Sequence, residues 1–179
     1  ATPVVDSHLT DAPLESLNSG VVLIQEFRTA MFLAELSNLQ LWTTDVGNAC
    51  LESHTSEKVC IIAGPEFGEL KDHILVIVKA LYGLKTSGQQ WHDRLHDCLI
   101  ELGFKPCKAE PDIWMRKTKK GDKWEYIAVY VDDLALALED PQSVIDALSS
   151  APFKFKLKGS GPIAFHLGME FTRDEDGTL

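Results

Sequence analysis

Residues 127–138 read Ile-Ala-Val-Tyr-Val-Asp-Asp-Leu-Ala-Leu-Ala-Leu, a pair of acidic residues between two apolar runs of five. Runs of this length are typical of buried β-strands, and a short polar break between them favours a tight turn. The stretch therefore predicts an antiparallel hairpin with Asp132 and Asp133 at its turn. Adjacent carboxylates repel each other and resist burial, so this turn is either solvated or a site where oxygen ligands hold a divalent cation.

A second acidic position supports a cation site. Asp45 lies at the end of another short β-like run, 41–46. If this run lies beside the hairpin, Asp45, Asp132 and Asp133 form a platform of three carboxylates. Such a platform can hold two Mg²⁺ ions about 4 Å apart, one activating a nucleophilic oxygen and one stabilising the leaving group. The arrangement indicates nucleotidyl transfer, in which positioning and charge neutralisation supply most of the catalysis.

The rest of the chain reads as short strands between amphipathic helices. Apolar residues at helical spacing predict helices over 21–38, 87–102 and 141–150. Gly103 is a natural end for the second helix, and Asp140 and Pro141 form an N-cap and a first residue for the third. Strand-like runs occur at 41–46, 58–63, 74–78, 112–116, 124–131, 134–138, 153–157 and 165–172, with a Gly-Ser-Gly-Pro turn at 159–162. Because hairpins dominate, we expect an α+β fold whose mostly antiparallel sheet packs against two or three helices.

The composition is that of an ordinary globular domain. The 179 residues are 45 % hydrophobic and 25 % charged, which excludes collagenous, disordered and disulfide-scaffold proteins. We expect a loosely ordered lead-in over 1–20 and one domain over 21–179. No apolar run approaches the roughly 20 residues of a transmembrane helix. The formal charge of −10 argues against a protein that binds nucleic acid over a broad basic surface.

The four cysteines are widely spaced and include no C-x-x-C pair. They are Cys50, Cys60, Cys98 and Cys107. Because each lies in or beside an apolar stretch, we expect buried, reduced thiols and a reducing compartment. The alternative is a zinc site that combines Cys98 and Cys107 with His92 and His96, although this spacing matches no standard zinc finger.

Several motifs occur in one order along the chain. Tyr-Val-Asp-Asp at 130–133 resembles the tyrosine-x-Asp-Asp box of reverse transcriptases. Ala-Leu-Tyr-Gly-Leu-Lys-Thr-Ser at 80–87, followed by Trp91, resembles the signature of Ty1/copia-type retrotransposon polymerases. Further matches are at 102–104, 109–112 and 165–170. The chain thus resembles a Ty1/copia-type reverse transcriptase over most of its length. The resemblance implies a polymerase palm-like fold and RNA-directed DNA polymerase activity within a Pol polyprotein.

The resemblance also implies roles for matching positions. The catalytic carboxylates would be Asp45, Asp132 and Asp133, binding two Mg²⁺ ions with the Val46 carbonyl as an extra metal ligand. Lys158 matches a catalytic lysine that serves as a charge partner or proton donor for pyrophosphate. The alternation of Lys154, Lys156 and Lys158 is equally typical of a solvated strand face.

Other positions resemble the nucleotide, template and primer contacts of the family. The nucleotide and template contacts would be Cys50, Gly83, Lys85, Ser87 and Tyr130, and the primer-grip-like positions His166, Leu167 and Gly168. Cys50 departs from the family pattern, which usually has an aromatic residue there that rejects ribonucleotides. The smaller cysteine implies an open gate beside the sugar.

The resemblance implies as partners an RNA or DNA template-primer, a deoxynucleoside triphosphate and other Pol segments. It implies an intracellular location in the cytoplasm or the nucleus, and the sequence leaves an organelle open. The chain looks like a palm whose fingers and thumb are largely missing, and we expect it to be inactive alone. The acidity and the Cys50 departure also fit a second hypothesis. In that hypothesis the chain is a catalytically silent, repurposed domain that serves as a structural subunit among protein partners in a larger complex.

Overall fold

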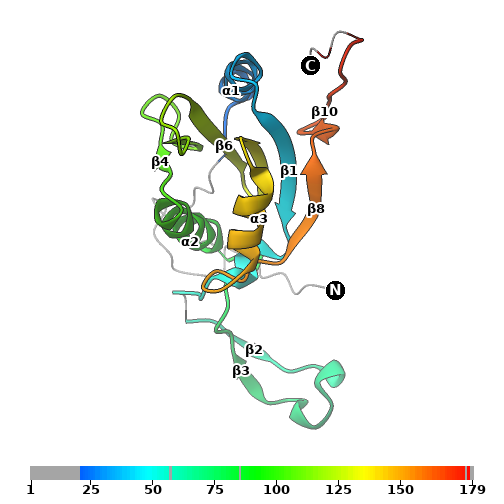
Figure 1. The fold of residues 1–179 in the computed structure, drawn as a ribbon. Helices are drawn as coiled ribbons and strands as arrows, with labels where there is room; N and C mark the ends of the chain where they lie inside the picture. Colours follow the sequence, from blue (N-terminus) through cyan, green and yellow to red (C-terminus); the bar gives the residue numbers. More distant parts are fainter. Residues whose placement is uncertain (1–20, 57, 85, 176, 178–179) are drawn as a thin grey trace. The chain divides into compact units, whose positions relative to one another are not determined.

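The computed structural model describes residues 21–56, 58–84, 86–175 and 177, and the expected lead-in over 1–20 lies outside them. The chain forms two compact units. Of the described residues, those within 21–47 and 95–177 belong to the larger unit and those within 48–94 to the smaller. Figure 1 shows the elements of both units, and the sequence division between the units falls within helix α2 (Ser87–Glu101).

The larger unit is built on a six-stranded sheet in the order β4-β5-β6-β7-β1-β8 (Figure 1). The strands are β1 (Gln40–Val46), β4 (Lys105–Pro106), β5 (Ile113–Lys117), β6 (Trp124–Tyr130), β7 (Asp133–Leu138) and β8 (Leu157–Pro162). Every neighbouring pair is antiparallel. The expected α+β fold with an antiparallel sheet is therefore confirmed.

Strand β7 is buried on both faces and organises the core. Ala135 and Ala137 belong to a core cluster with the apolar face of helix α1 (Ile24–Leu36), where small side chains let the helix approach the sheet. Successive side chains in a strand alternate between faces. The other face therefore carries the fully buried Leu134, Leu136 and Leu138. Helix α3 (Pro141–Ser149) contacts β1, β7 and β8, and buries Val144, Ile145 and Leu148.

The three predicted helices are present, with small differences at their ends. Helix α1 is shorter than 21–38: Leu23 is still extended, and Asn38 has a left-handed φ of 53° that ends the helical path. Gly103, with a φ of 85°, follows α2 as expected. Asp140 caps α3 by accepting a hydrogen bond from the backbone N–H of Ser143 at 3.3 Å. Among the described residues, no helix is both long enough and apolar enough to cross a membrane.

Two expectations for the C-terminal part are wrong. Residues 153–156 are not a strand, and β8 instead includes the Gly-Ser-Gly-Pro sequence that was expected to turn. Because β8 lies at the edge of the sheet, Pro162 is tolerated without a ladder donor. Residues 165–172 form a tight hairpin of β9 (Phe165–His166) and β10 (Met169–Glu170) rather than one strand.

The smaller unit contains a separate two-stranded hairpin. Strand β2 (Cys60–Ile62) pairs antiparallel with β3 (Ile74–Val76), and the 3₁₀ segment η4 (Pro65–Leu70) joins them. A second 3₁₀ helix, η3 (Ala49–Glu52), precedes the hairpin in the chain. Both strands lie within the predicted runs 58–63 and 74–78.

All four cysteines are thiols rather than disulfide partners. Cys50 and Cys98 are buried and Cys107 is partly buried, in line with the apolar sequence around them. Cys60 is exposed, so the expectation of a buried thiol is wrong there. It lies on a strand of the isolated hairpin, where one face has no layer packed on it within the described part of the smaller unit.

Candidate functional site

Three aspartates meet at one end of the large sheet. Strand β1 pairs with β7 in a register that puts Asp45 directly opposite Asp133. Asp132 occupies the turn just before β7. The backbone N–H of Val46 donates to the carbonyl of Asp132 at 2.9 Å, which ties this turn to the end of β1. Strand pairing therefore brings together the three carboxylates that are far apart in the sequence.

The turn between β6 and β7 contains a strained residue. Tyr130 pairs with Asp133, so only Val131 and Asp132 form the turn. Val131 has a φ of 57°, a left-handed value that a two-residue hairpin turn requires and that β-branched residues rarely adopt. Strain of this kind costs on the order of 1–3 kcal/mol and persists where the surrounding structure enforces it. The two flanking strands thus hold both aspartates in a defined turn.

Burial and mutual repulsion raise the pKa of two of these carboxyl groups. For Asp45 the largest cause is desolvation, followed by the negative charges of Asp132 and Asp133, while Lys158 acts in the opposite direction. Desolvation and the charge of Asp132 likewise raise the pKa of Asp133. Folding has therefore gathered negative charge that a single lysine offsets only in part. This is the electrostatic environment in which a cation is stabilised.

Lys158 reaches the cluster from the edge strand. Strand β8 pairs with β1 so that Lys158 is opposite Asp45. Its side chain lies across Gly47, where an added Cβ would be 2.7 Å from Cε and 3.0 Å from Nζ. Gly47 is thus a site residue that the sequence reasoning missed. In the sequence, the only indication that Gly47 belongs to the site is its position two residues after Asp45. This position becomes informative only when the pairing of β8 with β1 is known.

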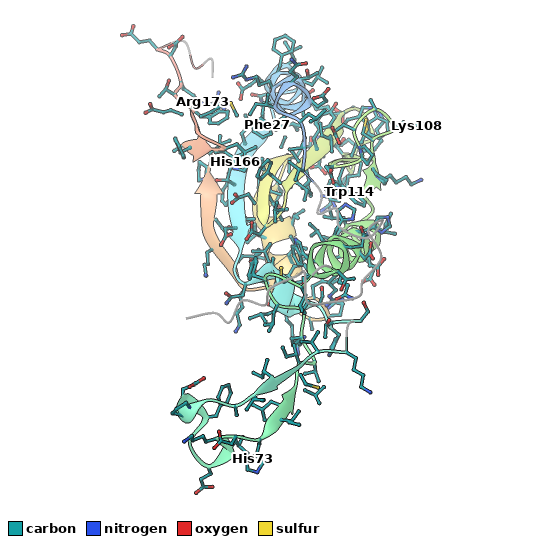
Figure 2. All side chains as sticks on the ribbon, turned by 180° about the vertical axis from the view of Figure 1, so that it is seen from behind. Phe27, His73, Lys108, Trp114, His166 and Arg173 are labelled. Carbon is teal, nitrogen blue, oxygen red and sulfur yellow. The ribbon has the colours of Figure 1, made fainter. Side chains whose placement is uncertain are left out.

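The other predicted residues of the larger unit lie in two places. Tyr130 ends β6 beside the aspartate turn and is partly exposed. His166 is buried on β9, and its ring centroid lies 5.2 Å from that of Phe27 on α1. Figure 2 labels both residues. Burial lowers the pKa of His166, and its Nε2 has no hydrogen-bond partner within the described residues. Leu167 and Gly168 form the β9–β10 turn with φ values of 49° and 77°.

The remaining predicted residues belong to the smaller unit. Cys50 is buried in η3. Gly83 has a φ of 98°, which explains the need for glycine at that turn. Ser87 begins α2, and its hydroxyl donates to the Leu81 carbonyl at 2.7 Å. Lys85 lies outside the described residues.

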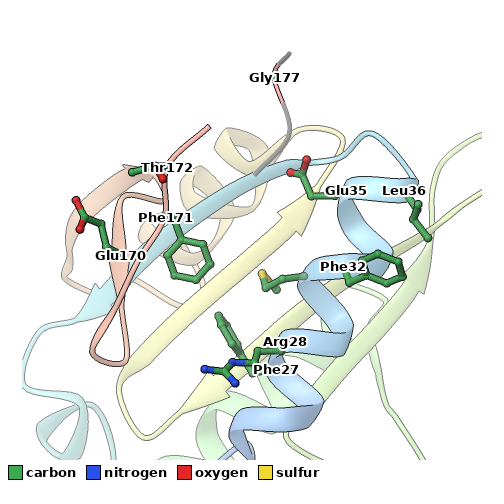
Figure 3. Close-up of a pocket in the computed structure, with 10 residues that line it drawn as sticks. Phe27, Arg28, Phe32, Glu35, Leu36, Glu170, Phe171, Thr172 and Gly177 are labelled. Carbon is green, nitrogen blue, oxygen red and sulfur yellow. The ribbon is translucent and has the colours of Figure 1, made fainter. Parts of the chain in front are cut away.

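A cavity of about 690 Å³ lies between α1 and the chain around and after β10 (Figure 3). Its apolar lining consists of Phe27, Met31, Phe32, Leu36 and Phe171. Beside it Arg173 donates to both carboxylate oxygens of Glu35, at 2.9 and 2.7 Å. None of the three clustered aspartates lines this cavity, so the cavity and the carboxylate cluster are separate features.

Neither the carboxylates nor the alternative zinc ligands form a ready metal site. Among the described residues, no group of three or more His, Cys, Asp or Glu side chains is already arranged to hold a metal ion. His96 packs edge-on against Trp114 with ring centroids 5.1 Å apart, and Cys98 is buried in the core. The zinc alternative therefore gains no support from the packing of these residues.

Residues 8–179 match the family described as reverse transcriptase (RNA-dependent DNA polymerase), and the chain belongs to this family. Enzymes of the family act on nucleic acid and generally use Mg²⁺. No solved structure matches the chain. The family assignment confirms the resemblance carried by the ordered motifs.

The similar proteins are encoded by transposons. The chain is 27 % identical over 135 residues to the retrovirus-related Pol polyprotein from transposon RE1 of Arabidopsis thaliana, covering 74 % of this chain and 9 % of that protein. It is 28 % identical over 138 residues to the putative transposon Ty5-1 protein of Saccharomyces cerevisiae, covering 75 % and 44 %. It is 24 % identical over 162 residues to the Pol polyprotein from transposon TNT 1-94 of Nicotiana tabacum, covering 89 % and 12 %. The chain thus spans less than half the length of these relatives.

Proposed function

We propose that this chain is the palm segment of a copia-type RNA-directed DNA polymerase, with metal-dependent nucleotidyl transfer at Asp45, Asp132 and Asp133. The observation that carries the proposal is the strand pairing that puts Asp45 opposite Asp133 with Asp132 in the adjoining turn. The raised pKa of Asp45 and of Asp133 supports it, because excess negative charge favours cation binding. Membership of the reverse transcriptase family supports the reaction class.

The donor atoms suit Mg²⁺, which prefers hard oxygen ligands. The carboxylates of Asp45, Asp132 and Asp133 would hold it, together with the Val46 carbonyl. Because the described side chains are not already arranged as a metal site, binding would require them to rearrange. When bound, Mg²⁺ supplies Lewis acidity that favours attack by an oxygen nucleophile and departure of pyrophosphate.

The residues of the chain itself supply position and charge. The bond from Val46 to the Asp132 carbonyl keeps the aspartate turn against β1. Lys158 presents its Nζ beside Asp45 across Gly47, where it can neutralise a phosphate group or give a proton to departing pyrophosphate. The proposed nucleotide, template and primer contacts are Cys50, Gly83, Lys85, Ser87, Tyr130, His166, Leu167 and Gly168.

A Mg²⁺ titration of the chain followed by ¹⁵N NMR tests the proposal. We expect the amide signals of residues 45–47 and 131–133 to shift together as the ion binds, and Asp132→Asn to remove the response. Asp174→Asn changes the same charge at an exposed position away from the sheet end, and it should leave the titration unaltered. Spectra of the unmodified chain that do not respond to Mg²⁺ would contradict the proposal. That result would favour the second hypothesis, a catalytically silent structural subunit.

A further inference from the structure

The turn between β5 and β6 concentrates positive charge in an acidic chain. Residues 116–123 read Arg-Lys-Thr-Lys-Lys-Gly-Asp-Lys, five basic residues and one acidic residue, for a local charge of +4. Because the whole chain carries −10, the other residues together carry −14. Clustered lysines of this kind bind the phosphate backbone of nucleic acids. The segment therefore has the opposite electrostatic character from the rest of the chain.

Hydrogen bonds within this turn fix its conformation, and one of them is accepted by its single acidic residue, Asp122. The backbone N–H of Thr118 donates to the Lys123 carbonyl at 3.0 Å, and the Thr118 hydroxyl donates to Asp122 at 2.8 Å. The latter bond holds the pKa of Asp122 below its ordinary value. Four lysines project from the turn, of which three are exposed and the last is partly exposed: Lys117, Lys119, Lys120 and Lys123. Within the described part of the chain, none of them takes part in an ion pair.

The charged groups next to the turn are an inward-facing pair, Arg116 with Glu125, and two exposed acidic residues, Glu139 and Asp140. The Nε of Arg116 donates to the buried Glu125 at 2.7 Å. Glu139 and Asp140 line the adjoining cavity together with Lys117 and Lys119, and the Asp140 side chain already caps α3. The outward side of the turn, rather than this cavity, is therefore the surface that suits an anionic ligand.

An exposed aromatic ring completes the surface. Trp124 is 41 % exposed and lies opposite Lys117 in the β5–β6 register. The Nζ of Lys117 is 4.3 Å from the centroid of the Trp124 ring. Trp91 and Trp114, in contrast, are buried. An exposed ring among lysines can stack on an unpaired base while the ammonium groups contact the flanking phosphates.

We propose that Lys117, Lys119, Lys120, Lys123 and Trp124, here called the lysine surface, bind single-stranded nucleic acid. The surface lies at the opposite end of β6 from the aspartate turn, about 20 Å away at the usual rise of a strand. The inference goes beyond the proposed function, because it requires neither a metal ion nor the clustered aspartates. It gives the chain a nucleic-acid contact despite its overall negative charge.

Fluorescence anisotropy with a labelled thymidine dodecamer at low salt tests the lysine surface. We expect the triple variant Lys119→Ala, Lys120→Ala, Lys123→Ala to bind at least tenfold more weakly than the unmodified chain. Trp124→Leu should weaken binding about tenfold, the scale of one stacked base, and the oligonucleotide should quench tryptophan fluorescence in the unmodified chain. Circular dichroism verifies that each variant is folded.

Matched controls separate the surface from general electrostatics. The triple variant Lys58→Ala, Lys71→Ala, Lys79→Ala makes the same change of charge in the smaller unit and should retain affinity. The anisotropy measurement needs no metal ion, so failure of the metal site and failure of the lysine surface give different results. Equal losses in the two lysine triples would overturn the proposal. Displacement by polyglutamate as efficient as by unlabelled oligonucleotide would also overturn it, in favour of an acidic polypeptide ligand.

Discussion

Arg116 and Glu125 depend on each other as a charge pair inside the larger unit. Buried Glu125 accepts hydrogen bonds from Arg116 Nε at 2.7 Å and from the backbone N–H of Glu139 at 2.9 Å. The guanidinium also donates to the Leu102 carbonyl and lies 4.2 Å from the centre of the Phe104 ring. Arg116→Ala leaves a buried carboxylate without its countercharge, and we expect the free energy of unfolding in urea to fall by about 3 kcal/mol. The double variant Arg116→Met, Glu125→Leu should recover most of this loss, and an equal loss in both variants would contradict the account.

The negative charge of the Asp133 carboxylate destabilises the folded chain, because it is partly buried and lies beside Asp132. The pKa of Asp133 is raised by desolvation and by Asp132, so the folded chain binds a proton more tightly than the unfolded chain. Between the ordinary pKa near 3.8 and the raised value, stability therefore falls as the pH rises, and the penalty is fully present at neutral pH. We expect Asp133→Asn to raise the free energy of unfolding at pH 7 by about 0.5 kcal/mol, the scale of a partly screened charge interaction.

Urea denaturation with and without Mg²⁺ measures this effect of Asp133. Saturating Mg²⁺ should stabilise the unmodified chain and have little effect on the asparagine variant, because only a ligand that binds the folded state adds stability. At a pH below 3.8 the advantage of the variant should disappear. A variant that is less stable than the unmodified chain at pH 7 would show that the Asp133 carboxylate makes a favourable interaction instead.

At the scale of elements, local patterns predict what depends on local sequence. The β6–β7 hairpin follows from two apolar runs around Asp132 and Asp133, and the cap of α3 follows from Asp140 and Pro141. Strand β8 was missed because its Gly-Ser-Gly-Pro sequence is typical of a turn, and only pairing with β1 holds it extended. The candidate site likewise has one part that local sequence predicts and one part that depends on strand pairing. The adjacent aspartates are readable from sequence, whereas the role of Gly47 depends on a register between distant strands.

The β2–β3 hairpin should be the least protected sheet of the molecule. Its two strands pair only with each other, and Ile62, Ile74 and Val76 are each more than 60 % exposed. A two-stranded hairpin without a packed face is marginally stable in water. We expect the amides of β2 and β3 to exchange with deuterium far faster than those of β6 and β7, as measured by mass spectrometry of peptic peptides. Equal protection of both sheets would show that the apolar hairpin face is covered in solution.

At the scale of the whole molecule, the net charge of −10 is the sum over regions of opposite charge. Asp45, Asp132 and Asp133 concentrate negative charge at one end of β6, and the lysine surface concentrates positive charge at the other end. With a net charge of −10, a reverse transcriptase segment of this composition has little overall attraction for the phosphate backbone. Its affinity should therefore depend on a few local contacts and respond strongly to salt.

The salt dependence of binding measures how many phosphates the lysine surface contacts. If the four lysines of the lysine surface each neutralise one phosphate, the logarithm of the association constant for the thymidine dodecamer should fall with a slope of about −3 against the logarithm of salt concentration. Removing three of them, in Lys119→Ala, Lys120→Ala, Lys123→Ala, should reduce the slope to about −0.7, because fewer counterions are released. Anisotropy titrations at several potassium chloride concentrations give both slopes. A slope that is unchanged in the triple variant would place the phosphate contacts on other residues, and the lysine surface could then not be what holds the strand.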